Sequence, residues 1–395
     1  MEAAAKLQST TPRQEAIGAD LPASHLAESH LPALDGIRGV AVLMILLFHY
    51  WQSYYQFPAA SAVQADFRFL AGGQFGVDLF FVLSGFLITG ILLNAKGSPH
   101  FLRNFYMRRA LRILPLYYLL VCSYFLCFWI DSGFQSTVRQ LWWYFPYLQN
   151  VGMTFWPGVV GGPGHFWSLG VEEHFYLLWP ILVWRCDERR LPFYLLAIIG
   201  GAFLCRLVML PLVGADNIFW FSPCRMDALA LGALLSVGVR RPEYAQNVLK
   251  ACRWGLLVMG PLLLVLYPLT SGKSLYTMQT LKYLLVAVAF TTLLGTVIGP
   301  NKWTWLEQLF STGFLRWCGK YSYAIYVFHP FLYDYITTRL RPIVPLAKTH
   351  LELYLACEFV LLFAVVLFVS WSSWHLFEKH FLKLKRYFEY SVSRA

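Results

Sequence analysis

An arginine and a histidine, Arg38 and His49, lie eleven residues apart in one apolar stretch, LPALDGIRGVAVLMILLFHYW. In an α-helix, eleven residues complete about three turns, so the two side chains share a face and lie about 16 Å apart along the axis. Ionisable groups are costly inside a membrane, and those that occur there are mostly functional. We therefore interpret the pair as one site and expect both side chains to open into a single passage. The alternative for His49 is a buried residue that only satisfies a hydrogen bond.

A second basic cluster, Arg108, Arg109 and Arg112, lies in the segment FYMRRALRILPLYY. Arg109 and Arg112 are three residues apart and share a helical face, and paired guanidinium groups suit bidentate binding of phosphates. An extended pantetheine arm is comparable in length with the separation of about 16 Å between Arg38 and His49. Phosphates held by these arginines would therefore place a thioester beside the imidazole. The alternative is that the cluster only anchors a helix end at the cytoplasmic face.

A further set of polar residues lies toward the outer ends of the predicted spans, away from the arginine cluster. Its members are Asp78, His165, Glu172, Glu173, Arg225 and Asp227. Several acids and an arginine at similar depth predict a polar cavity that faces outwards, and carboxylates with aromatic rings suit a hydroxylated, sugar-like acceptor. Alternatively, Asp227 pairs with Arg225. Glu172 and Glu173 are neighbours and cannot both point the same way, so we expect one of them to face the cavity and orient the acceptor or shuttle a proton.

His329 lies near the middle of a later predicted span and is followed by Pro330, which loosens a helix. It is either a second catalytic group or a hydrogen-bond partner. Ser84 and Gly85 are interpreted as close-packing positions. The sequence has no GxSxG elbow, HExxH motif, Walker loop or metal-spaced Cys/His cluster, and we expect no metal ion and no bound cofactor.

The composition indicates what kind of fold holds these residues. Of the 395 residues, 58% are hydrophobic and 13% are charged, whereas a soluble domain has about 25% charged residues. The chain is therefore predicted to be an integral membrane protein. Its net charge of +11 does not indicate nucleic-acid binding, because the basic residues lie between apolar segments and report topology instead.

Apolar segments that can cross a hydrocarbon core of about 30 Å predict an all-α bundle of about ten transmembrane helices. They begin near residues 36, 75, 111, 166, 192, 225, 254, 281, 321 and 351. Residues 132–165 form the longest connection, an aromatic-rich loop expected to fold against the headgroup layer or to dip back into the membrane. Most Lys and Arg residues fall on one side if both termini are cytoplasmic, which is the predicted orientation. The expected organisation is a disordered cytoplasmic tail (1–30), a membrane domain (31–380) and a basic cytoplasmic tail (381–395).

Several motifs in this order resemble the membrane acyltransferase 3 family of bacterial integral-membrane O-acyltransferases. The resemblance runs over about residues 31–385. It rests on the segments LPALDGIRG with its arginine and histidine, GVDLFFVLSGFLITG, FYMRRALRILPLYY, HFWSLGVEEHFYLLWP, RMDALALGALLS and YSYAIYVFHPFL. Two positions depart from the family pattern: His174 replaces the usual glutamine, and Phe328 stands where a tryptophan often precedes the histidine.

The resemblance implies transfer of an acyl group, commonly acetyl, from cytoplasmic acyl-CoA to a hydroxyl group. The acceptor would often be a surface carbohydrate or glycan, and the protein would lie among the lipids of the bacterial inner membrane. By motif match, Arg38 and His49 take over the catalytic pair, and Arg109 and Arg112 the essential arginine pair. His49 would act as general base on the acceptor hydroxyl or take the acyl group first.

The main alternative function is a secondary transporter or exporter, because buried His, Glu and Arg residues suit that class as well. The two halves of the sequence show no repeat, which argues against it. A non-catalytic scaffold is a third alternative, but it would leave the buried charges without a reason.

Overall fold

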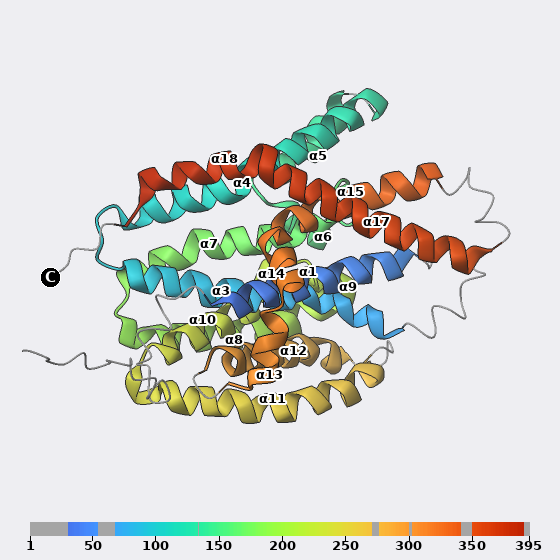
Figure 1. Cartoon of the computed structure of the whole chain (residues 1–395). Helices are drawn as coiled ribbons and strands as arrows, with labels where there is room; N and C mark the ends of the chain where they lie inside the picture. The colour runs from blue at the N-terminus through green and yellow to red at the C-terminus, as the bar shows by residue number, and fades with distance from the viewer. Residues whose placement is uncertain are drawn as a thin grey trace, which may run out of the picture.

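The computed structural model of the chain describes residues 31–53, 68–132, 134–270, 276–299, 302–340 and 350–390. Every regular element in these ranges is a helix, and the long helices run side by side along one direction (Figure 1). These are α1 (Pro32–Ser53), α3 (Gly76–Ala95), α4 (Phe101–Ser132), α7 (Trp167–Arg185), α8 (Leu191–Val213), α10 (Met226–Val239), α11 (Pro242–Thr270), α12 (Tyr276–Ile298), α15 (Ser322–Leu340) and α17 (Leu351–Ser373). The predicted all-α membrane bundle is confirmed, and the predicted tail 1–30 lies outside the described residues.

Short helices join or extend the long ones. The 3₁₀ segments are η4 (Arg68–Phe75), η5 (Gly164–Phe166), η6 (Glu188–Arg190), η7 (Ser222–Arg225) and η9 (Leu384–Phe388), and η8 (Trp374–Glu378) is a π-helix. The short α-helices are α5 (Phe134–Tyr144), α6 (Gln149–Phe155), α9 (Ala215–Ile218), α13 (Thr304–Phe310), α14 (Gly313–Lys320) and α18 (Lys379–Lys383). The prediction of one loop over 132–165 is therefore wrong for α5 and α6. Packing against α4 and α7 overrides the turn-like composition of this segment.

Seven helices within the described ranges are long and apolar enough to cross a membrane. They cover Pro32–Gln52, Leu70–Ala95, Phe101–Ile130, Glu188–Val213, Pro242–Val265, Thr280–Ile298 and Leu353–Phe388. The other three predicted spans fall on α7, α10 and α15. Of these, α10 has only 14 residues, which at 1.5 Å per residue is about 21 Å of helix, less than the membrane core. The membrane fold is thus established, and the count of ten remains a prediction.

The centre of the bundle is the crossing of α3 and α10. A Cβ atom on Gly85 would lie 1.9 Å from the carbonyl oxygen of Leu229, and one on Gly232 would lie 1.9 Å from that of Val82. Any side chain at either position would push the helices apart. The prediction of close packing at Gly85 is confirmed, and it agrees with the preference of membrane helix interfaces for small residues.

Two short helices, α13 and α14, cross the first half of α1 near the middle of the bundle (Figure 1). A Cβ atom on Gly36 would lie 1.6 Å from the carbonyl oxygen of Phe310, and one on Gly39 would lie 2.0 Å from that of Leu315. The glycines of the LDGIRG segment therefore face α13 and α14. Arg38 is two residues, or about 200°, from Gly36, so it points to the other side of α1, toward the interior.

The C-terminal segment continues α17 and packs on α4. After Ser373 the helix passes through η8, α18 and η9 to Phe388. The side-chain amide of Asn104 in α4 donates a hydrogen bond to the carbonyl oxygen of Glu389 (2.9 Å). The described part of the predicted tail, up to residue 390, thus lies against the bundle.

Candidate active site

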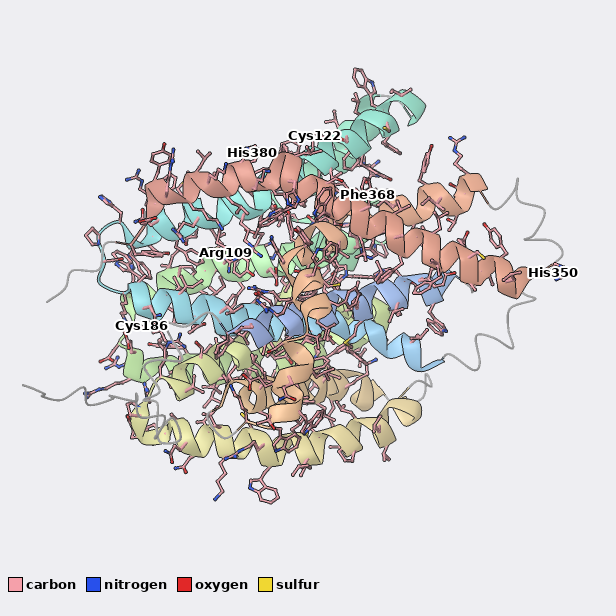
Figure 2. The ribbon with its side chains drawn as sticks, in the orientation of Figure 1. Arg109, Cys122, Cys186, His350, Phe368 and His380 are labelled. Carbon is pink, nitrogen blue, oxygen red and sulfur yellow. The ribbon has the colours of Figure 1, made fainter. Side chains whose placement is uncertain are left out.

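A cavity of about 100 Å³ lies where α1, α3, α4, α7 and α15 meet. Its charged lining residues are Arg38 from α1, Arg109 and Arg112 from α4, and Glu172 from α7. We call it the arginine cavity. Figure 2 shows Arg109 in the interior of the bundle. Three guanidinium groups against one carboxylate give the described lining a net positive charge, which suits an anionic ligand with several oxygen atoms.

A hydrogen-bond network fixes one wall of the arginine cavity. The guanidinium carbon of Arg109 lies 4.8 Å from the centroid of the Tyr176 ring. The Tyr176 hydroxyl donates to Oγ of Ser84 (3.0 Å), and the Ser84 hydroxyl donates to Oε1 of Glu172 (2.6 Å). Glu172 therefore faces the cavity, whereas Glu173 does not line it. Ser84 is a hydrogen-bonding residue of the site as well as a neighbour of the close-packed Gly85.

The other arginines of the cavity have carboxylates at their edges. Arg38 forms an ion pair with Asp35 one turn earlier (3.0 Å between NH1 and Oδ1). Arg112 lies near enough to Arg38 and to Glu378 to interact electrostatically with both. Glu378 is buried in the π-helix η8 and accepts a hydrogen bond from the Ser373 hydroxyl (3.0 Å). Sequence reasoning did not single out Glu378, although π-helical turns such as η8 occur frequently at functional sites.

Arg108 was expected to bind the donor together with its neighbours, but the structure places it elsewhere. Its NH1 donates to the carbonyl oxygens of Lys385 (3.3 Å) and Phe388 (3.4 Å) at the end of the C-terminal segment. It does not line the arginine cavity. The reason is helical geometry, because adjacent residues point about 100° apart around a helix.

Three histidines from different elements meet deeper in the bundle, and we call them the histidine cluster. Nε2 of His329 in α15 lies 3.2 Å from Nδ1 of His49 in α1. The ring centroids of His165 and His329 are 5.7 Å apart. Each ring is also held by a backbone carbonyl: His49 Nδ1 by Ile45 (3.0 Å), His329 Nδ1 by Tyr326 (2.8 Å) and His165 Nε2 by Val327 (3.2 Å).

The histidine cluster borders a second cavity of about 20 Å³, which is mainly apolar. Its lining residues are Leu46, His49, Tyr50, His329, Tyr333, Phe359, Leu362, Phe363 and Val366. Arg38 and His49, which were expected to open into a single passage, line separate cavities in this structure. They do share a face of α1, but α15 lies along it and contributes Tyr326 to the first cavity and His329 to the second.

Two hydrogen-bond contacts connect the lining of the arginine cavity to the histidine cluster. The Ser168 hydroxyl lies 2.5 Å from the Tyr326 hydroxyl, which itself donates to the carbonyl oxygen of His165. Ser168 and Tyr326 both line the arginine cavity, and His165 belongs to the histidine cluster. The Tyr326 side chain thus connects the lining of the arginine cavity to the backbone of the histidine cluster.

Three residues expected to contact an acceptor are buried in ion pairs instead. Arg225 pairs with Asp78 (2.7 Å), and Asp227 pairs with Arg206 (2.7 Å). All four side chains are almost fully buried, and none of them lines the arginine cavity or the cavity beside His49. The alternative pairing of Arg225 with Asp227 is also wrong, because residues two apart on a helical segment do not face each other.

Sequence reasoning passed over Arg206, which pairs with Asp227, and Tyr326, which lines the arginine cavity. Arg206 is an isolated arginine inside the apolar α8, which is a signal that could have been used. Tyr326 stands four residues before Pro330 in a segment rich in tyrosine, where nothing in its spacing distinguishes it. Within the described ranges, no group of three or more His, Cys, Asp or Glu side chains is arranged to hold a metal ion.

Comparison with known proteins identifies the family to which this chain belongs. The family model described as an acyltransferase domain matches residues 31–375. YrhL of Bacillus subtilis is 30% identical over 77% of this chain and 49% of its own length. The peptidoglycan O-acetyltransferase OatA of Listeria monocytogenes is 28% identical over 77% of the chain and 49% of its own length. The O-acetyltransferase OatA of Staphylococcus aureus is 26% identical over 76% of the chain and 50% of its own length.

The chain thus spans about half the length of the curated relatives it matches. No solved structure matches it significantly.

Proposed function

The chain belongs to the acyltransferase 3 family, and on that basis we propose that it moves an acyl group, acetyl by default, from acyl-CoA to a hydroxyl group of a glycan. The observation that carries the proposal is the arginine cavity, in which Arg38, Arg109 and Arg112 converge from two helices. Arg38 lies on the same helix as His49. The chain therefore has an anion-binding group and an imidazole base on one rigid element.

The arginine cavity is the proposed donor site. Acyl-CoA carries several phosphate oxygens, and guanidinium groups bind phosphate through paired, charge-assisted hydrogen bonds. The pantetheine arm would extend along α1 past Tyr326 and bring the thioester to His49, a distance of about 16 Å along the helix. The two cavities are separate in this structure, so a path between them must open for this step. The donor would enter from the cytoplasm, with both termini on that side of the inner membrane.

His49 is the proposed general base. Its imidazole takes the proton from the acceptor hydroxyl while the hydroxyl oxygen attacks the thioester carbonyl carbon. The carbon–sulfur bond then breaks, and the departing CoA sulfur takes the proton back from the imidazole. A placed base of this kind contributes typically about 10²–10⁴-fold to the rate. Glu172, held by Ser84, limits the positive charge of the donor cavity.

The acceptor is proposed to approach His49 from the side of the second cavity, which places His49 and His329 beside aromatic side chains and must widen to admit a sugar. Aromatic rings and a base suit a sugar hydroxyl. The names of the relatives from Listeria and Staphylococcus refer to O-acetylation, in one case of peptidoglycan. By analogy we propose a cell-wall or other surface glycan as the acceptor of this chain.

The test uses the purified protein in lipid nanodiscs with radiolabelled acetyl-CoA and glycan fragments as acceptors. Transfer of label to the glycan by the wild type, and its loss in His49→Ala, is the expected result. Binding of CoA should survive in His49→Ala and weaken in Arg109→Ala. Solute uptake by proteoliposomes in the absence of acyl-CoA, without any transfer of label, would support the transporter instead.

A further inference from the structure

The hydrogen bonds around His49 and His329 determine the tautomer of each ring, because backbone carbonyls fix which nitrogen carries the proton. Nδ1 of His329 lies 2.8 Å from the carbonyl oxygen of Tyr326 and 3.2 Å from that of Ile325. A carbonyl oxygen only accepts hydrogen bonds, so Nδ1 of His329 must be the protonated nitrogen. In the neutral ring, Nε2 of His329 then carries a lone pair and accepts.

The carbonyl oxygen of Tyr326 is available for this bond because of Pro330. In a regular α-helix, the backbone N–H of residue 330 would donate to the carbonyl of residue 326. Proline has no N–H, so it leaves this acceptor without its helical donor. Pro330 lies inside α15, directly after His329. The His-Pro dipeptide therefore supplies both the imidazole and the acceptor that orients it.

The same reasoning passes from His329 to His49. Nδ1 of His49 lies 3.0 Å from the carbonyl oxygen of Ile45 and 3.2 Å from Nε2 of His329. Both of these neighbours are acceptors, so Nδ1 of His49 must carry the proton. In the neutral imidazole the lone pair is then on Nε2 of His49.

We propose that His329 is a positioning residue, which Pro330 orients and which holds His49 in the tautomer that presents its Nε2 lone pair to the acceptor hydroxyl. The kinetic part of this inference rests on the proposed function. When His49 takes the hydroxyl proton on Nε2, the positive charge spreads over a ring whose Nδ1–H already donates to two acceptors. His329 thus does for His49 what a carboxylate does in a Ser-His-Asp triad, but without adding a buried charge.

His165 does not compete for this arrangement. Its Nε2 lies 3.2 Å from the carbonyl oxygen of Val327, so that nitrogen donates to the backbone. Its ring centroid is 5.7 Å from that of His329, whereas the His49 and His329 centroids are 4.9 Å apart. His49 and His329 therefore form the hydrogen-bonded pair.

The first experiment requires no turnover. Nitrogen-15 NMR of histidine-labelled protein in lipid nanodiscs distinguishes a protonated ring nitrogen from one with a lone pair, and difference spectra with His49→Asn and His329→Gln assign the signals. The expected spectrum of the wild type has protonated Nδ1 and unprotonated Nε2 in both rings. A His49 signal with its proton on Nε2, or with both nitrogens protonated at neutral pH, would overturn the proposal.

The second experiment separates positioning from packing. In His329→Gln the amide oxygen replaces the accepting nitrogen, whereas in His329→Leu the side chain fills space but accepts nothing. Removing the acceptor should lower kcat by about 10²-fold, within the range of a general base, while the glutamine variant stays within about tenfold of wild type. The KM for acetyl-CoA should not change. Equal losses in the two variants would mean that His329 only packs.

The third experiment addresses the proline. Pro330→Ala restores an N–H that competes with His329 for the Tyr326 carbonyl, so kcat should fall several-fold and the His329 Nδ1 signal should shift. Pro211→Ala is the matched control, because Pro211 also lies inside a helix, α8, away from the histidine cluster. If both variants behave as wild type in kcat and in the spectrum, Pro330 has no such role.

These measurements distinguish the two proposals. If the spectra show the expected tautomers but the protein transfers no acyl group, the proposed function is wrong and the positioning role of His329 stands. If the protein transfers an acyl group but His49 is protonated on Nε2, the proposed function stands and the positioning role is wrong.

Discussion

Nε2 of His329 lies 3.2 Å from Nδ1 of His49, although the two residues are 280 positions apart in the chain. The rings meet edge to face, with an angle of 62° between their planes. This contact joins α1 to α15, and both histidines line the apolar cavity. It places the candidate base, His49, beside that cavity.

His49→Ala should lower turnover and preserve donor binding. In the proposed mechanism the imidazole acts on the acceptor hydroxyl, whereas the CoA phosphates bind at the arginine cavity. We expect kcat for acetyl transfer to fall by about 10²–10⁴-fold, the usual contribution of a general base. Transfer kinetics and calorimetric titration with CoA measure the two effects separately. Transfer at the wild-type rate would show that His49 is not the base.

Arg109 and Arg108 are adjacent and should behave differently. Arg109→Ala removes a guanidinium from the arginine cavity, the proposed donor site, and the loss of a charged hydrogen bond of about 1.5–3 kcal/mol should weaken CoA binding by about tenfold or more. Arg108→Ala removes the contacts with Lys385 and Phe388, so it should leave CoA affinity unchanged and reduce thermal stability. Equal losses of affinity in the two variants would contradict the assignment of the cavity.

Asp78→Asn should destabilise the fold even though Asp78 touches neither cavity. The substitution leaves the Arg225 guanidinium uncompensated in the interior, and breaking a buried ion pair costs about 3–5 kcal/mol. Thermal unfolding in detergent measures the effect. The double variant Asp78→Asn, Arg225→Gln should recover part of the loss, because it removes both charges. Glu243→Gln, at an exposed position at the start of α11, is the control and should have no effect.

Gly85→Leu should separate α3 from α10 and lower thermal stability. A Cβ atom at this position already lies 1.9 Å from the Leu229 carbonyl oxygen, so the larger side chain forces the backbones apart. Overpacking of this kind costs about 1–3 kcal/mol. Gly260→Leu is the matched control, since a Cβ on Gly260 meets no atom within 4 Å. A melting temperature for Gly85→Leu equal to that of the control would refute the close contact.

Several properties of this protein follow from the sequence alone because they depend on local periodicity and composition. The apolar runs predict an all-α membrane bundle, and the helical repeat places Arg38 with His49, and Arg109 with Arg112, on common faces. The same repeat explains why Glu172 and Glu173 diverge. The motif order also points to the acyltransferase family, which the match over residues 31–375 establishes.

The neighbours of these residues were decided only by the tertiary structure. Asp78 and Arg225 are 147 residues apart, and the sequence offered Asp227 as an equally good partner for the arginine. The position of α15 along the face of α1 set His329 against His49 and put Tyr326 in the lining of the arginine cavity. Local pattern fixes the face on which a side chain lies, but its partner depends on how the helices pack, and that packing is determined by the whole chain at once.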